Sequence, residues 1–439
     1  MTKRILAGAM LALASTDLAA QTAAQPTTTV IRAARMITIA NAGVVQNAAI
    51  IVTGDKIVAA GPSASVAVPA GAKVVDLGDV TLLPGFIDGH THIIGRTLGD
   101  PMGDVASVRD YESYGAILGV ENARRTLMAG FTTIRVLGAG NFDDMALRKA
   151  IEDGRAAGPR MQNAGHSLGI TGGHCDSNGW RPGINESGVE EGIANGPDEV
   201  RASVRYQVKY GADVIKTCAT GGVLSEGDAV GTTQYNFEEM KAMVDEARQH
   251  ERRVAAHAHG TEGIKIATRA GVASIEHGSF LDAEGARLMA RNGTYLVPTL
   301  MAGEAVERFA TSGVLKGLRA EKALAAAAAM RKAIRLAVAN KVPIAFGTDA
   351  GVIPHGTNAR EFRLMVEWGG MSPVAALRAG TIDAARLLGW ERRIGTIEAG
   401  KLADIVAVPG NPLADIHVTE RVTFVMKGGM VFKGPGAVE

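Results

Sequence analysis

The sequence has few of the features that mark several classes of protein. Its positive and negative charges nearly cancel, giving a formal net charge of +1, and no run of like charges occurs. The chain therefore has no electrostatic basis for binding nucleic acid or an anionic membrane surface. Beyond the N-terminal segment, no stretch is long and apolar enough to predict a transmembrane helix. We expect a protein with neither a nucleic-acid partner nor a membrane partner.

Cysteine is also scarce, since the chain contains only Cys175 and Cys218. Two cysteines imply no disulfide framework. A single bridge between them is one alternative. The sequence favours two thiols in separate loops or strands.

The N-terminus has the three-part pattern of a secretory signal. Residues 2–4 are polar and basic, and residues 5–15 form an apolar run too short to span a bilayer. Small residues follow, and they give one plausible cleavage site at 18–20, before Gln21, and another at 22–24. We predict a signal peptide over residues 1–20, with a disordered or helical tail as the alternative. The mature protein is then expected to be periplasmic or secreted.

The composition fits a large globular chain. With 439 residues, 46% of them hydrophobic and 21% charged, it can hold one large domain with a companion, or two to three small ones. Residues 27–84 consist of short apolar runs separated by turn residues, which predicts a small β-sheet unit. Strand patterns return over residues 391–439, and we expect them to complete the same β-sandwich, built from both termini.

Between these β segments, over residues 85–390, apolar strands alternate with amphipathic helices. The helix patterns cover 114–128, 321–340 and a segment that begins at the capping residues Asn236 and Glu239. A further helix is predicted after the N-cap pair Ser372-Pro373. Candidate strands are 80–83, 131–137, 160–164, 213–217, 253–258, 274–276, 295–298 and 343–347.

Strands that alternate with helices indicate a parallel α/β fold, and eight repeats over this length favour a (β/α)8 TIM barrel. An open doubly wound sheet is the alternative. It is disfavoured because no G-x-G-x-x-G motif follows the first strand.

Residues that can bind metals stand where several of these strands end. His90 and His92 follow the first strand, and the period of two places both imidazoles on one side. The later strand ends carry Lys216, His257, His259, His277 and Asp349. Since the active sites of such barrels lie at the carboxyl ends of the strands, we expect these side chains to converge.

The residue types suit a divalent metal centre. Imidazole and carboxylate are ligands of zinc and similar ions. A lysine amine in a pocket of low dielectric constant can lose its proton and add carbon dioxide, and the carbamate then resembles a bridging carboxylate. Asp349 could both bind a metal and move a proton between water and a leaving nitrogen.

Each feature has a structural alternative when taken alone. A histidine after a strand is commonly a hydrogen-bonded core residue, and Lys216 could be salt-bridged or form a Schiff base. Asp349, in Gly347-Thr348-Asp349, could be a turn residue or a helix cap. The joint pattern is what favours a metal site.

These motifs resemble those of the amidohydrolase superfamily of metal-dependent hydrolases. The resemblance rests on the segment 84–92, on His257, His277 and Gly347-Thr348-Asp349, and on the tail 395–406. Segments 171–174, 214–217, 221–225 and 255–260 are similar to the imidazolonepropionase-related branch. That branch contains Xaa-Pro dipeptidases, other carboxypeptidase-like dipeptidases and ochratoxin-hydrolysing amidohydrolases.

The resemblance implies a two-metal site, with zinc as the expected ion. His90, His92 and Asp349 would hold the first metal, and His257 and His277 the second. Lys216, carboxylated by carbon dioxide, would bridge them. His259, which is not in this ligand set, is expected to contact the substrate. A homo-oligomer is a further expectation from the resemblance.

The expected activity is cleavage of the amide bond of N-acyl amino acids or dipeptides, including ochratoxin-type aryl amides. A metal-bridging hydroxide would attack, and Asp349 would carry the proton to the departing amine. Weaker candidates for substrate binding are His166, Arg96, Tyr235 and His355, all in predicted loops. Two alternatives remain: a cyclic amide or imidazolone hydrolase, against which Lys216 argues, and a non-catalytic scaffold on the same fold.

Overall fold

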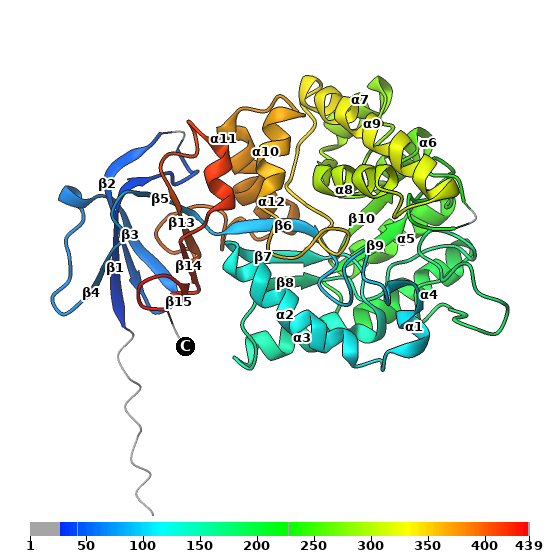
Figure 1. Ribbon diagram of the computed structural model, residues 1–439, viewed down its shortest axis with the longest axis horizontal. Helices are drawn as coiled ribbons and strands as arrows, with labels where there is room; N and C mark the ends of the chain where they lie inside the picture. Colours follow the sequence, from blue (N-terminus) through cyan, green and yellow to red (C-terminus); the bar gives the residue numbers. More distant parts are fainter. Residues whose placement is uncertain (1–26, 42, 227, 438–439) are drawn as a thin grey trace, which may run out of the picture.

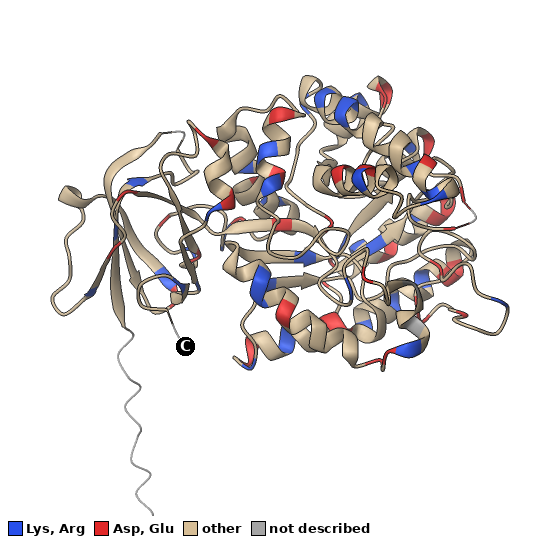
Figure 2. Cartoon of the chain, viewed as in Figure 1, with Lys and Arg blue, Asp and Glu red and all other residues tan. Residues whose placement is uncertain are grey.

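The computed structural model describes residues 27–41, 43–226 and 228–437. The predicted signal peptide, residues 1–20, lies outside the described residues. Figure 1 shows a β-sheet unit at one side and a larger unit of helices and parallel strands beside it. Basic and acidic positions are interspersed along the described chain (Figure 2).

The β-sheet unit joins strands from both ends of the described chain. Its order is β15-β14-β13-β5-β1-β2-β3, and β4 pairs with β1. Strand β5 pairs with β13 in antiparallel register, so N-terminal and C-terminal segments lie side by side in one sheet (Figure 1). The strands are β1 (Thr28–Met36), β2 (Val45–Thr53), β3 (Lys56–Pro62), β4 (Lys73–Asp76), β5 (Val80–Pro84), β13 (Ile405–Pro409), β14 (Phe424–Lys427) and β15 (Met430–Lys433).

The larger unit contains two parallel sheets. One has the order β6-β7-β8 and the other β12-β11-β10-β9. The strands are β6 (Phe86–Thr91), β7 (Phe131–Val136), β8 (Arg160–Asn163), β9 (Val214–Cys218), β10 (Arg253–Ala258), β11 (Ser274–His277) and β12 (Tyr295–Val297). Six of these seven lie within one or two residues of predicted strands, and their parallel pairing confirms the α/β class.

The strand predicted before the histidine pair is misplaced. Residues 80–83 belong to β5 of the β-sheet unit, and His90 lies within the next strand, β6. The chain changes sheets at Gly85, whose N–H donates to Asp404 while Phe86 donates to Gly130. A Cβ at Gly85 would lie 2.1 Å from the hydroxyl of Thr132. Only glycine fits this crossing, and the sequence pattern alone merged the two strands into one.

The last predicted strand, 343–347, is not a regular strand in the structure. It makes a single bridge, from Ile344 to Leu296, and the carbonyl of Phe346 accepts a hydrogen bond of 2.8 Å from Gly89. The segment thus links β12 to β6. On the other side, Asp213 donates to Asn163 at 2.8 Å and Leu168 bridges Thr217, which links β8 to β9.

Helices pack outside the parallel strands (Figure 1). The predicted helices are present, and Asn236 and Glu239 form the reciprocal capping box. Ser372 caps α11, which continues through a π-helical turn over Ala379–Asp383. The helices are α1 (Ala106–Arg109), α2 (Tyr114–Met128), α3 (Asp143–Glu152), α4 (Gly196–Lys209), α5 (Phe237–Gln249), α6 (Thr261–Ala270), α7 (Ala283–Asn292), α8 (Leu300–Thr311), α9 (Gly317–Ala339), α10 (Arg360–Glu367), α11 (Pro373–Arg378) and α12 (Ala384–Leu388).

The hydrophobic core lies mainly between these helices and the parallel strands. Phe86, Phe131, Phe346 and Phe362 meet there, with ring centroids 4.4–5.6 Å apart. Within the described residues, no helix is both long and apolar enough to cross a membrane. This core fixes the strand ends on which the polar residues stand.

The expectation of two separate thiols is wrong. Cys175 and Cys218 form a disulfide, with their Cα atoms 5.8 Å apart. The loop after β8 folds back along β9, where Leu168 accepts from the N–H of Cys218 and donates to the carbonyl of Lys216. This long-range pairing brings the two cysteines together, and no local sequence pattern reveals it.

Candidate metal centre

A cavity of about 680 Å³ opens at the carboxyl ends of the parallel strands. The polar residues of the strand ends line it, together with an apolar wall from α8, α9 and the segment between them. The polar residues of the strand ends are His90, His92, Lys216, His257, His259, His277 and Asp349, and His174 lines the cavity beside them. The structure therefore brings together the seven residues that the sequence placed at strand ends.

Strand register explains why these side chains share a face. Lys216 pairs with Ala255, and two residues further along β10, His257 pairs with Cys218. His257 also lies opposite Glu276 of β11. Since side chains two apart point the same way, Lys216, His257 and Glu276 all project from one side of the sheet.

His277 breaks this alternation. It follows Glu276 directly, so a regular strand would turn its side chain to the opposite face. Its φ of +69° takes the backbone out of the strand conformation. Asp349 has a φ of +60°, and its N–H donates to the carbonyl of His90 at 2.8 Å. Two of the polar residues thus occupy left-handed backbone positions, which are typical of functional sites.

The nitrogen and oxygen donors form two groups. The donor atoms of His90, His277 and Asp349 lie within 4.8 Å of one another, and so do those of His257, His259 and His277. The Nε2 atom of His92 lies 3.4 Å from Oδ1 of Asp349. His277 stands between the two groups.

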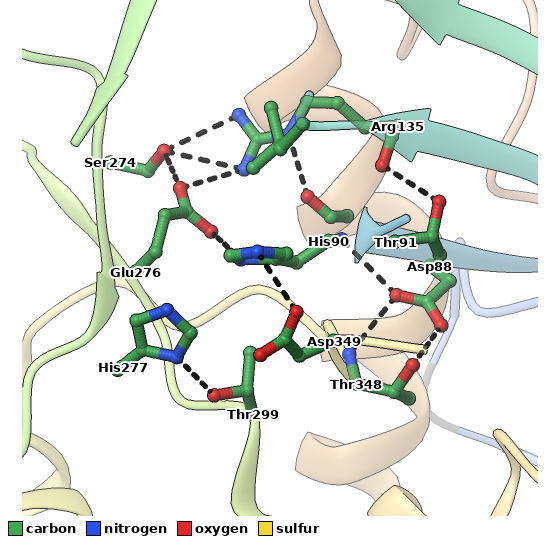
Figure 3. Close-up of polar contacts among 12 residues, drawn as sticks. Asp88, His90, Thr91, Arg135, Ser274, Glu276, His277, Thr299, Thr348 and Asp349 are labelled. Atoms are coloured by element: carbon green, nitrogen blue, oxygen red, sulfur yellow. Dashed lines mark hydrogen bonds and ion pairs between the residues drawn. The ribbon is translucent and has the colours of Figure 1, made fainter. Parts of the chain in front are cut away.

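A buried carboxylate orients the first histidine (Figure 3). Oε2 of Glu276 accepts a hydrogen bond of 2.9 Å from Nδ1 of His90, and Oε1 accepts from Arg135 at 2.9 Å. His92 is held through Nδ1 by the carbonyl of Gly138 at 3.3 Å, and His277 by Thr299 at 2.7 Å. The second ring nitrogen of each is therefore directed toward the cavity.

Asp88 ties the strand of His90 to the segment of Asp349. Its carboxylate accepts hydrogen bonds from Thr348 and from the backbone N–H of His90 (Figure 3), and a third from Asn358. Complete burial raises the pKa of Asp88 to about 6. The side chain does not line the cavity, and it positions His90 and Thr348 by accepting hydrogen bonds from their backbone N–H groups.

The electrostatics of the site favour neutral imidazoles. Burial lowers the pKa of His92 to about 4 and that of His259 to about 3, and it lowers the pKa values of His90, His257 and His277 well below the ordinary value. Burial also lowers the pKa of Lys216 to about 8, although the carboxylates of Glu276 and Asp349 oppose it. Burial raises the pKa of Asp349 to about 6, with Lys216 opposing.

The donor set fits a divalent metal ion. Nε2 of His90 is buried and has no hydrogen-bond partner in the structure, although its other nitrogen is paired. An unpaired buried nitrogen is costly, and a metal ion would satisfy it. Imidazole and carboxylate donors surround the same point, as zinc-type ions require.

Of the five residues predicted to bind the substrate, two line this cavity and three do not. Arg96 and His259 line the cavity. Arg96 is ion-paired with Asp100 and Asp110, while Nδ1 of His259 lies 2.6 Å from the hydroxyl of Ser279. Their role in binding the substrate stays a prediction.

The structure does not place the other three at this cavity. Tyr235 is completely buried, and its hydroxyl donates to Ala194. Nδ1 of His166 lies 3.2 Å from Gln207, with its ring against Phe142. His355 lines a different cavity. A loop position in sequence does not show whether the side chain is turned toward the site or into the core.

His174 was missed as a site residue. Its ring centroid lies 4.2 Å from that of His257, and burial lowers its pKa to about 4. A Cβ at Gly222 would lie 2.1 Å from the His174 ring, so this close packing requires glycine. The available signal was the Gly-Gly-His motif at residues 172–174, which the sequence analysis used only for family resemblance.

Comparison with known proteins supports a metal-dependent hydrolase site. The model of the amidohydrolase family matches residues 81–431. Ochratoxinase from Aspergillus niger is 38% identical over 380 residues, covering 81% of this chain and 76% of the relative. Imidazolonepropionase from Deinococcus radiodurans is 27% identical over 391 residues, covering 86% of this chain and 89% of the relative.

Solved structures of similar proteins point to the same family. A Xaa-Pro dipeptidase with methionine bound in its active site has a TM-score of 0.87 and 39% identity, covering 93% of this chain and all of that chain. The structure of A. niger ochratoxinase has a TM-score of 0.81 and 32% identity, covering 94% and 97%. These relatives match the branch that the sequence motifs indicated.

Proposed function

The chain belongs to the amidohydrolase family and is a hydrolase acting on amide bonds, and we propose that it cleaves dipeptides and N-acyl amino acids at a two-metal centre. The observation that carries this proposal is the cavity on which Lys216, His257, His277 and Asp349 converge with the His90–His92 pair. The relatives named for ochratoxin and Xaa-Pro dipeptide hydrolysis support the same substrate range.

We assign His90, His92 and Asp349 to one ion and His257 and His277 to the other, with Zn²⁺ as the expected metal. Lys216, carboxylated by carbon dioxide, would bridge them. Bound ions would supply Lewis-acid polarisation of the amide carbonyl and a nucleophilic water. The position of His277 in both donor groups fits a site in which two ions share one small space.

The chain's own contribution to the reaction centres on Asp349. Oδ1 lies 3.5 Å from Nε2 of His90 and 3.4 Å from Nε2 of His92. Because burial raises the pKa of this carboxyl to about 6, it can accept a proton and return it near neutral pH. We assign it the transfer of the proton to the departing amine.

The rest of the cavity supports binding of a substrate with an apolar part. Val306, Leu315 and Met330 form an apolar wall, and Arg96 and Arg319 stand on the same cavity. An apolar side chain or aryl acyl group would bury against this wall, and guanidinium groups can bind a terminal carboxylate. His259 stays a candidate for contact with the substrate carbonyl.

The finer architecture is also part of this proposal. The two parallel sheets and the linking segment 343–347 fit a (β/α)8 TIM barrel over residues 85–390. The eight-stranded sheet fits a composite β-sandwich of residues 27–84 and 391–439. Location in the periplasm or outside the cell, and assembly as a homo-oligomer, remain predictions from the sequence.

Hydrolysis of an imidazolone or another cyclic amide is the second candidate, supported by the relative from Deinococcus radiodurans. The buried Lys216 beside Asp349 argues against it, since such chemistry needs no bridging lysine. A non-catalytic scaffold would not be expected to keep a complete ligand set.

The direct test is a substrate screen with the metal-loaded protein. Xaa-Pro, Xaa-Phe and Xaa-Arg dipeptides, N-acyl amino acids and an imidazolone would be compared by release of amino acid or ring opening. We expect turnover of dipeptides or N-acyl amino acids. Turnover of the imidazolone alone would refute the proposal and favour the second candidate.

A further inference from the structure

A second cavity, of about 710 Å³, lies across helix α8 from the metal-centre cavity. Ala302 and Val306 of this helix line the metal-centre cavity, whereas Met301 and Arg308 line the second one. The loop that follows Asp349 also lines both cavities. Gly351 and Val352 line the metal-centre cavity, whereas Ile353 and Pro354 line the second one. The second cavity is therefore a separate space that shares two supporting elements with the proposed active site.

The lining of the second cavity carries an excess of positive charge. Five basic and two acidic residues line it, which leaves a formal excess of three positive charges (5 − 2 = 3). The basic residues are Arg124, Arg125, Arg308, Arg360 and Lys433, and the acidic residues are Glu304 and Glu420. Converging positive charge in a partly enclosed space attracts anions.

Three of the five cations are already paired. Arg124 and Arg125 both contact Glu121, at 3.0 and 2.8 Å, and Arg360 contacts Glu304 at 2.6 Å. Because these three cations already contact carboxylates, they do not by themselves call for a ligand.

Arg308 and Lys433 differ from the other three. Among the described residues, no carboxylate forms an ion pair with either of them, and Lys433 instead donates to the carbonyl of Met128 at 3.0 Å. The guanidinium of Arg308 lies 5.3 Å from the centroid of its neighbour Phe309. Burial without a counter-charge lowers the pKa of Lys433. A bound anion would supply both groups with a counter-charge.

A buried polar group adds an independent sign of a ligand. His355 is only 6% exposed and lines the cavity, and its Nδ1 has no hydrogen-bond partner. The Nε of Arg360, on the same cavity, is also buried and unpaired. Unpaired buried polar atoms are uncommon in folded proteins and point to a missing partner.

We propose that this second cavity binds a small oxyanion with two or more negative charges, such as a phosphate group or a dicarboxylate, through Arg308 and Lys433. Arg360 adds a further guanidinium to the lining, and His355 lies beside it. The site is distinct from the metal centre and does not depend on which amide the enzyme cleaves.

The test is calorimetric titration of the metal-loaded protein with inorganic phosphate and, separately, with succinate. We compare the unchanged protein with the double variant Arg308→Gln/Lys433→Gln. Since each charged hydrogen bond is worth roughly tenfold or more in affinity, we expect at least a roughly tenfold weakening in the double variant. Arg124→Gln is the matched control, because it removes a cation of the same cavity that is already paired, and its affinity should stay within about twofold of the unchanged protein.

Phosphate could also bind at the metal centre, and the double variant separates the two sites. Binding that persists unweakened in the double variant would overturn the proposal, as would absence of binding of both probes at millimolar concentration. Preference for phosphate or for succinate identifies the oxyanion group that the cavity selects. Thermal unfolding of each variant checks that the fold is retained; should the double variant unfold, the single variants Arg308→Gln and Lys433→Gln, each expected to bind more weakly, take its place.

Discussion

Nδ1 of His90 donates a hydrogen bond of 2.9 Å to Oε2 of Glu276, and both side chains are almost completely buried. This contact fixes the imidazole so that Nε2, which has no hydrogen-bond partner and lies 3.5 Å from Oδ1 of Asp349, is free to bind a metal. Arg135 holds the second oxygen of the same carboxylate at 2.9 Å. The orientation of one proposed ligand is thus determined by residues on two other strands.

Replacing Glu276 should weaken metal binding more than it disturbs the fold. We expect Glu276→Gln to lower metal affinity by about 10- to 100-fold, the usual effect of losing the hydrogen-bond partner of a ligating histidine. Competition with a chelator measures this. Glu246→Gln is the control, since Glu246 is a buried carboxylate paired with Arg205 away from the cavity. Equal metal affinity in both variants would contradict the role of Glu276.

Reconstitution of the metal-free protein should depend on pH through Lys216. Its pKa in the folded state, about 8, lies below the ordinary 10.5, so raising the pH increases the neutral amine that adds carbon dioxide. The neutral fraction rises from roughly 3% at pH 6.5 to about 75% at pH 8.5. At a fixed concentration of dissolved carbon dioxide, recovery of activity should be faster at pH 8.5. Equal rates at both pH values, or recovery without carbon dioxide, would argue against the carbamate.

Asp349 should be needed for turnover rather than for folding. Asp349→Asn removes the group that accepts and returns the proton, and we expect kcat to fall by at least about 100-fold at saturating metal. Asp282→Asn is the control, because Asp282 caps helix α7 and pairs with Lys265 away from the cavity, so the change should leave kcat unchanged. Near-normal kcat in Asp349→Asn, with hydrolysis still dependent on metal, would rule out the assigned role.

The Cys175–Cys218 disulfide should stabilise both the fold and the cavity wall. It closes a loop with a sequence separation of 43 residues. Replacing both cysteines with serine should lower the free energy of unfolding by about 4 kcal/mol. The KM should also rise, because the neighbouring His174 packs against His257. Denaturant unfolding under non-reducing conditions and steady-state kinetics measure the two effects, and an unchanged unfolding curve would contradict the first.

Much of the centre was predictable because its residues follow local patterns. The His-x-His pair, the apolar strand that ends near His257 and the Gly-Thr-Asp motif of Asp349 can be recognised without knowing the fold, although only the strand of His257 lies where it was predicted. Helix α5 was equally accessible, since Asn236 and Glu239 form its cap from neighbouring residues.

The features that escaped prediction depend on contacts distant in sequence. Gly85 separates two strands only because Thr132 leaves no room for a side chain. Glu276 gains its role from Arg135, which lies 141 residues away. Tyr235 stands in a loop yet donates to Ala194 in the core. No pattern within a short window contains this information.

The metal content of the purified chain tests the central claim most directly. Elemental analysis of the unchanged protein and of Lys216→Ala, prepared side by side with carbon dioxide present, should give about two divalent ions per chain for the first and clearly fewer for the second. Asp349→Asn, which removes another proposed ligand, is the control for the loss of any single ligand. Circular dichroism of each sample checks that the fold is retained. One ion or fewer in the unchanged protein, or two ions retained in Lys216→Ala, would contradict a lysine-bridged two-metal centre.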